Sequence, residues 1–208
     1  SDAAATSLAK HAGPLYLDSL SKLSDAVAAS LAKHEQTLNF SYGGIGELPN
    51  NPGPGHVDLI KKLGASAASE YQALEICCME ISDAMAQTLA EVEAPLSLYF
   101  LKTLESVPLA RKLASQESVE LPALTVLSPE IALELAFCQG ALHLGGDENW
   151  ESANLQELSP AAAENLARHS GELVLGTNSI SPASAESLAL HTGSLTLVGL
   201  SELSAESA

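Results

Sequence analysis

The stretch LARHSGELVLGTNSIS, from Leu166 to Ser181, is followed closely by LALHTGSLTLVGLSELS, from Leu188 to Ser204. In both stretches a Leu-Ala pair is followed by a His, then a Gly, and then alternating apolar residues. The serines that end the two stretches, Ser181 and Ser204, are 23 residues apart. Self-similarity at a fixed period indicates a repeat architecture, in which each unit is one supersecondary structure.

The same unit can be followed along the chain from the serine that opens it. Its opening phrases are SDAVAASLAKHEQTLNF at Ser24, SDAMAQTLAEVEAPLSL at Ser82, SPEIALELAFCQGALHL at Ser128, SPAAAENLARHSGELVL at Ser159 and SPASAESLALHTGSLTL at Ser181. A serine hydroxyl in this place can accept a hydrogen bond from the first turn of a helix, and a proline directly after it fits the first helical position. Each unit is therefore expected to begin with a short, capped helix.

Alanine recurs four and eight residues after the serine, at positions that share one helix face. Small side chains on that face let a helix approach its neighbour closely. Each helix is expected to end with a His or a basic residue, followed by a glycine in the left-handed conformation that often terminates helices. The glycines in this position are Gly13, Gly140, Gly171 and Gly193.

After each helix the spacing of apolar residues changes from helical to alternating, which predicts a short strand. Eight such strands are expected, each with one outward residue between two inward ones. The outward residues are Tyr16, Asn39, Glu75, Ser97, Glu120, His143, Val174 and Thr196. Strands of successive units are expected to stack in parallel as one sheet.

The combined pattern, LxLxxLxxLSxxxAxxLAxH, resembles a leucine-rich repeat, whose period is about 20 to 29 residues. It is most similar to the cysteine-containing subtype and to divergent bacterial arrays, because Cys138 stands in the column that His11, His34, His169 and His191 occupy in other units. The resemblance covers essentially the whole chain but departs after the strand, where Leu replaces the usual Asn or Cys. It implies an α/β solenoid of about eight repeats: a curved right-handed coil with a parallel concave sheet, short convex helices and, commonly, a role in protein binding.

The chain is expected to form a single domain over residues 1–208, as a fragment of a longer array, because both ends stop inside a repeat. Two insertions interrupt the pattern. The first, near residues 42–59, is rich in Gly and Pro and predicts an exposed loop, with the next helix beginning near Gly55. The second, near residues 145–154, carries Trp150, the chain's single tryptophan. Insertions in repeat arrays form loops, often beside a binding face.

The composition disfavours several classes of partner. Nine Lys and Arg against 26 Asp and Glu give a formal charge of −17, which repels nucleic acid and anionic membrane surfaces. Such acidity mainly favours solubility and otherwise points to a basic partner. We expect no signal peptide and no transmembrane segment within this fragment and a protein that is soluble as given, and the sequence leaves its location open. Cys77, Cys78 and Cys138 lack the spacing of zinc sites or disulfide frameworks.

The sequence shows no strong motif for catalysis, cofactor binding or metal binding, and we expect none of these sites. The recurrent histidines lie in a line, whereas metal ligands must converge on one ion, so we expect them to bond backbone carbonyls at helix ends. Asp147, Glu148 and Glu151 lack the ligand alternation of calcium loops. Asn39 matches a glycosylation motif but falls in an expected strand.

Three hypotheses for function remain. The leading one is a non-enzymatic protein–protein interaction scaffold that binds an unidentified protein or peptide on the concave strands and the inserted loops. Aromatic residues are the expected anchors, and glutamates are expected to face basic groups. The candidate contact residues are Tyr16, Asn39, Glu75, Ser97, Tyr99, Glu120, His143 and Trp150.

The second hypothesis is a structural spacer array within a larger surface or envelope protein. The third, a hydrolytic enzyme, is disfavoured because the outward row has no converging nucleophile and base. No small-molecule substrate is indicated by the sequence.

Overall fold

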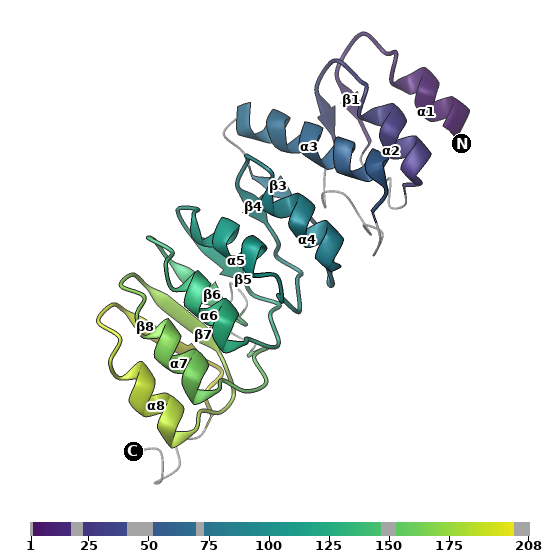
Figure 1. Cartoon of the computed structure of the whole chain (residues 1–208). Coiled ribbons are helices and arrows are strands. Elements are labelled where there is room, and N and C mark those ends of the chain that lie inside the picture. Colours follow the sequence, from purple (N-terminus) through teal and green to yellow (C-terminus); the bar gives the residue numbers. More distant parts are fainter. Residues whose placement is uncertain (1, 18–22, 41–51, 70–72, 147–152, 202–208) are drawn as a thin grey trace. The chain divides into compact units, whose positions relative to one another are not determined.

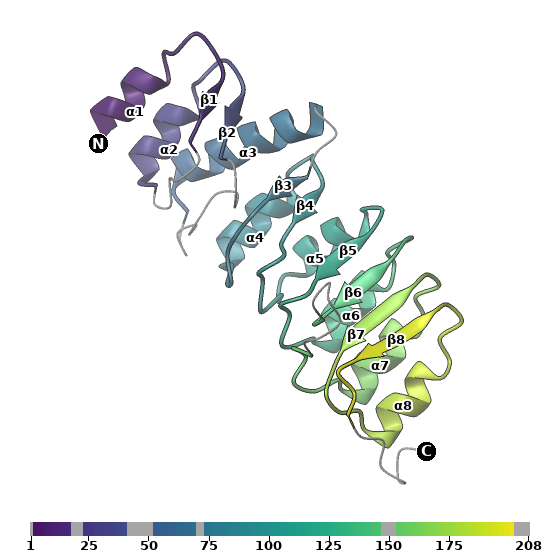
Figure 2. The same cartoon turned by 180° about the vertical axis from the view of Figure 1, so that it is seen from behind.

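Figures 1 and 2 show the computed structural model of the protein, which describes residues 2–17, 23–40, 52–69, 73–146 and 153–201. Within these residues eight helices alternate with eight short strands, so the α/β class predicted from the sequence is confirmed. The chain divides into two compact units, unit 1 (Ser1–Leu98) and unit 2 (Tyr99–Ala208). The single domain over residues 1–208 stays a prediction.

The described part of unit 1 contains four helix–strand pairs. In chain order these are α1 (Asp2–Leu8), β1 (Leu15–Tyr16), α2 (Asp25–Leu31), β2 (Leu38–Asn39), α3 (Pro54–Ser69), β3 (Leu74–Glu75), α4 (Asp83–Ala90) and β4 (Leu96–Ser97). Strand β1 pairs with β2, and β3 pairs with β4, in both cases in parallel. Part of the loop expected at 42–59 lies outside the described residues, and its last residues, from Pro54, begin α3.

In unit 2, the residues that the structure describes also form four helix–strand pairs. They are α5 (Val107–Ala114), β5 (Val119–Leu121), α6 (Pro129–Leu135), β6 (Leu142–Leu144), α7 (Pro160–Leu166), β7 (Leu173–Gly176), α8 (Pro182–Leu188) and β8 (Leu195–Val198). Strands β5 to β8 form one parallel sheet in chain order, and α5 to α8 lie along one face of it (Figures 1 and 2). Equivalent residues pair in register, as Leu142 does with Leu173 and Leu173 with Leu195.

The described strands form three parallel sheets rather than the one continuous sheet that the sequence predicted. In unit 1 the interruption falls between β2 and β3, where the chain passes through α3. That helix has 16 residues, whereas α2 has seven and α4 has eight. A 16-residue helix is about 24 Å long, so it does not return the chain to the preceding strand as a two-turn helix does.

Serine caps explain where the short helices begin. The hydroxyl of Ser24 accepts a hydrogen bond from the backbone N–H of Val27, three residues on. The same bond is made by Ser82, Ser106, Ser128, Ser159 and Ser181. The predicted caps are therefore confirmed, and each satisfies a backbone amide that has no partner within the helix.

The ends of the helices differ from the prediction. Gly13, Gly140, Gly171 and Gly193 were expected to be left-handed, but positive φ occurs, among the described glycines, at Gly145 (70°) and Gly199 (75°). The helices instead run into a residue in the right-handed conformation, such as Ala136 or Ala167. In unit 2 the glycine is needed for another reason: a Cβ at Gly140, Gly171 or Gly193 would collide with a backbone carbonyl of the preceding repeat.

The core of each unit lies between its helices and strands. Ala28 in unit 1 and Ala132 and Ala163 in unit 2 are fully buried, as expected for the small residues of the helix face. Neighbouring helices are also joined by an ion pair at the surface. Arg111 donates two hydrogen bonds to the carboxylate of Glu134, at 2.8 and 3.1 Å, and this guanidinium lowers the pKa of Glu134.

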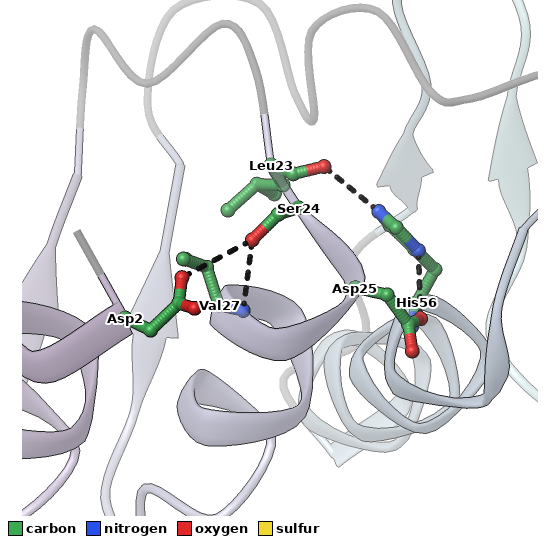
Figure 3. Close-up of polar contacts among 6 residues, drawn as sticks. All are labelled: Asp2, Leu23, Ser24, Asp25, Val27 and His56. Carbon is green, nitrogen blue, oxygen red and sulfur yellow. Dashed lines mark hydrogen bonds and ion pairs between the residues drawn. The ribbon is translucent and has the colours of Figure 1, made fainter.

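A polar network joins α2 to the start of α3 (Figure 3). The ring of His56 is 5% exposed, with Nδ1 2.9 Å from Asp25 Oδ1 and Nε2 2.9 Å from the carbonyl oxygen of Leu23. The backbone N–H of His56 also donates to Asp25 Oδ1, at 3.1 Å. A Cβ at Gly55 would collide with the backbone of Asp25, so the network forms where two helices meet closely. Sequence patterns do not reveal this network, because His56 and Asp25 are 31 residues apart.

Candidate functional site

The outward residues of the strands lie beside one another within each sheet, as predicted. In unit 1 Tyr16 pairs with Asn39, and Glu75 pairs with Ser97. In unit 2 Glu120, His143, Val174 and Thr196 follow one another across β5 to β8. Adjacent strands are about 4.8 Å apart, so equivalent residues of paired strands are close neighbours in each sheet. We call these residues the strand-face rows.

The strand-face rows differ in exposure from place to place. Tyr16 is 61% exposed, which is unusual for an aromatic ring on a strand, and Glu75 and Glu120 are also exposed. Ser97, His143 and Thr196 are half-buried. Val174 is only 3% exposed. The row in unit 2 is therefore exposed to solvent at Glu120 on β5 and buried at Val174 on β7. The accessible part of the face is therefore acidic in both units and aromatic in unit 1.

One other predicted contact residue, Tyr99, lies apart from the rows. Tyr99 is half-buried and packs edge-on against Phe100, with ring centroids 5.5 Å apart. Phe100 is 51% exposed and was missed by the sequence analysis, because it belongs to no repeated column. Trp150 and the side chain of Asn39 lie outside the described residues. The base of the insertion that carries Trp150 is described: Gly146 and Ala153 form an antiparallel bridge.

The recurrent histidines occupy the turn between helix and strand. His34 and His169 are each 1% exposed. His34 Nδ1 lies 3.3 Å from the carbonyl oxygen of Ala9, directly after α1, and His169 Nε2 lies 3.3 Å from that of Glu172. The rings of His169 and His191 stack, with centroids 6.0 Å apart. His34 and His169 are buried in the turns between repeats, whereas His11 is exposed. Among the described residues no three His, Cys, Asp or Glu side chains are placed to hold a metal ion.

All three cysteines are free thiols. Cys138, in the histidine column, is 2% exposed and its Sγ lies 3.8 Å from the carbonyl oxygen of Ala141. Cys78, three residues beyond the end of β3, is 8% exposed. Burial and the neighbouring Cys77 raise the pKa of the Cys78 thiol from 9.0 to about 11. Burial and the charge of Glu75 also raise the pKa of Cys77, which is half-buried.

We expect Cys78 to resist alkylation in the folded protein at pH 8. The thiolate is the reactive form, and at pH 8 a group with a pKa of about 11 is about 0.1% ionised. In a variant with Cys77→Ser and Cys138→Ser, burial still raises the pKa of Cys78, so the rate of iodoacetamide labelling should rise about tenfold between pH 8 and pH 9. Labelling in denaturant should be fast at pH 8. Rapid labelling of the folded variant at pH 8 would contradict the burial of this thiol.

The structure also shows a hollow that the sequence analysis did not predict. It has a volume of about 480 Å³ and lies in unit 1, against the end of α1, the end of α2 and the turns that follow them. Its lining includes Thr6, Lys10, His11, Ser30, Lys33 and Glu35. The signal available in the sequence was the recurrence of a basic residue after Leu-Ala, which we interpreted only as a helix ending.

Comparison with known proteins found no matching family model, no matching curated protein and no matching solved structure. None of the helices in the described residues combines the length and the apolar character that crossing a membrane requires.

Proposed function

We propose that the chain is a leucine-rich-repeat solenoid whose role is non-enzymatic: it is a scaffold that binds a protein or peptide on its strand face. The recurrence of one capped helix and one strand, paired in register with the next repeat, supports the repeat assignment. In this proposal the strand face is the concave side of the solenoid, and the helices are its convex side.

The observation that carries the binding proposal is the exposure of Tyr16 on a strand. A tyrosine ring left 61% exposed is available to anchor a partner, because aromatic residues dominate the energetics of protein interfaces. Glu75 and Glu120 are exposed at the equivalent outward position and suit a partner with basic groups. Flat rows of this kind offer contact area rather than the converging nucleophile and base of an enzyme.

The test is affinity capture from a lysate of the source organism with three baits. The first is the intact chain, and the second carries Tyr16→Ala, Glu75→Lys and Glu120→Lys. The third carries the same types of change on exposed residues outside the strands: Phe137→Ala, Asp58→Lys and Glu130→Lys. Circular dichroism confirms that each bait is folded.

We expect one protein to be retained by the first and third baits and to bind the second at least about tenfold more weakly, the loss typical of removing interface anchors. A separate Trp150→Ala bait tests whether the inserted loop takes part. If all three baits retain the same proteins, the scaffold proposal fails, and a spacer array within a larger surface or envelope protein becomes the better reading.

A further inference from the structure

We propose that the hollow between the ends of α1 and α2 binds a small organic anion that carries phosphate or carboxylate groups. The inference does not depend on the strand face, because the hollow is lined by helix ends and by the turns that follow them. Its volume of about 480 Å³ falls within the range of about 300 to 1,000 Å³ that is typical of small-molecule sites.

The first argument is that the two lysines of the hollow lack ion-pair partners. The chain has 26 acidic and nine basic residues, and some of the basic side chains form ion pairs with carboxylates. Lys61 pairs with Glu91 at 3.3 Å, Arg111 with Glu134 at 2.8 Å, and Arg168 with Glu164 at 3.5 Å. Lys10 and Lys33 both line the hollow, yet within the described part of the chain neither forms an ion pair or a side-chain hydrogen bond. The hollow thus contains two ammonium groups that form no direct ion pair with a carboxylate of the described chain.

The second argument is the polar lining between the two helices. Thr6 Oγ1 donates to the carbonyl oxygen of Asp2 at 2.9 Å, and Ser30 Oγ donates to that of Ala26 at 3.0 Å. The two hydroxyl oxygens lie 3.3 Å apart. Because their protons point to backbone carbonyls, both oxygens can accept hydrogen bonds from a ligand. A ligand with an anionic group for the lysines and hydroxyl groups for Thr6 and Ser30 matches this lining.

The negative charge of Glu35 limits which ligands fit, and removing it tests whether the ligand is an anion. Its carboxylate lines the same hollow and repels an anion, so it favours a bound position close to Lys10 and Lys33. Removing this charge while keeping the size of the side chain, as in Glu35→Gln, should therefore tighten binding. If Lys10 and Lys33 served only to balance the negative dipole ends of α1 and α2, Glu35→Gln would not change the affinity for an anion.

The experiment is a titration of the full chain, labelled with ¹⁵N, with glycerol 3-phosphate and, separately, with malate. Both probes carry hydroxyl groups, and they distinguish phosphate from carboxylate as the preferred anion. Low ionic strength is used because salt screens exposed charges. Two double variants are compared, Lys10→Ala with Lys33→Ala, and the control Lys62→Ala with Lys102→Ala. They have the same net charge, so any difference between them reports on the hollow.

We expect at least one probe to shift amides of residues 6–12 and 30–36. The Lys10/Lys33 variant should bind about tenfold more weakly, the control within about twofold of the intact chain, and Glu35→Gln about threefold more tightly. The proposal would be overturned if both double variants weakened binding equally, or if the shifts were confined to other residues. It would also fail if neither probe caused a shift at about 20 mM, a concentration that would detect even a millimolar dissociation constant. None of these results bears on the strand-face capture, so the two proposals fail separately.

Discussion

Replacing Leu166 with Ala is expected to lower the free energy of unfolding of unit 2 by about 3 kcal/mol, within the range of about 2 to 5 kcal/mol seen for buried leucines. Leu166 is the last residue of α7 and is 0% exposed, so the truncation removes buried apolar surface and leaves a cavity that the neighbouring repeats fill only in part. Urea denaturation followed by circular dichroism measures the change.

Leu190→Ala is the matched control for this prediction. It is the same chemical change two residues beyond the end of α8, where the side chain is 71% exposed. Its effect should stay within about 0.5 kcal/mol, as for most surface substitutions. In a repeat protein the damage from Leu166→Ala should also be local, with amide exchange accelerated first in β6, β7 and the helices beside α7. Equal losses from the two variants would contradict the core position of Leu166.

The elements that the sequence predicted well are those set by local chemistry. Ser24 and Ser159 mark helix starts because a hydroxyl bonds the amide three residues on, and this depends only on neighbouring residues. The alternation in the phrase Leu173-Val174-Leu175 likewise marks β7 without reference to its partners. Columns of equivalent residues then predict which strands pair in register, because each repeat meets the next in the same way.

The features that the sequence missed depend on how the chain packs. Asp25 and His56 meet only because the close approach at Gly55 brings α3 against α2, and His56 belongs to no repeated column. Val174 stands in the outward position of its strand but is buried, which strand alternation alone does not predict. Likewise, the pattern placed Lys10 and Lys33 in equivalent positions, but it gave no sign of the hollow that they line.

The glycine column shows how a correct position can be assigned to the wrong cause. Replacing Gly171 with Ala is expected to lower the free energy of unfolding of unit 2 by about 2 kcal/mol, within the range for overpacked sites. The new Cβ would collide with the carbonyl oxygen of Gly140 and lie 2.9 Å from Nε2 of the buried His169. Because the first of these groups is backbone of the preceding repeat, the two repeats would have to separate.

Gly13→Ala distinguishes two explanations for the glycine column: close approach of successive backbones, and a left-handed helix cap. At Gly13 an added Cβ would meet only the ring of His11, an exposed side chain that can move, at 3.2 Å. Alanine there should leave stability unchanged or raise it by up to about 1 kcal/mol, because it restricts the unfolded chain without straining the fold. A left-handed cap at both positions would make both variants less stable. Opposite signs for Gly171→Ala and Gly13→Ala, measured by urea denaturation with amide exchange to resolve the two units, would show that glycine is required where successive backbones meet.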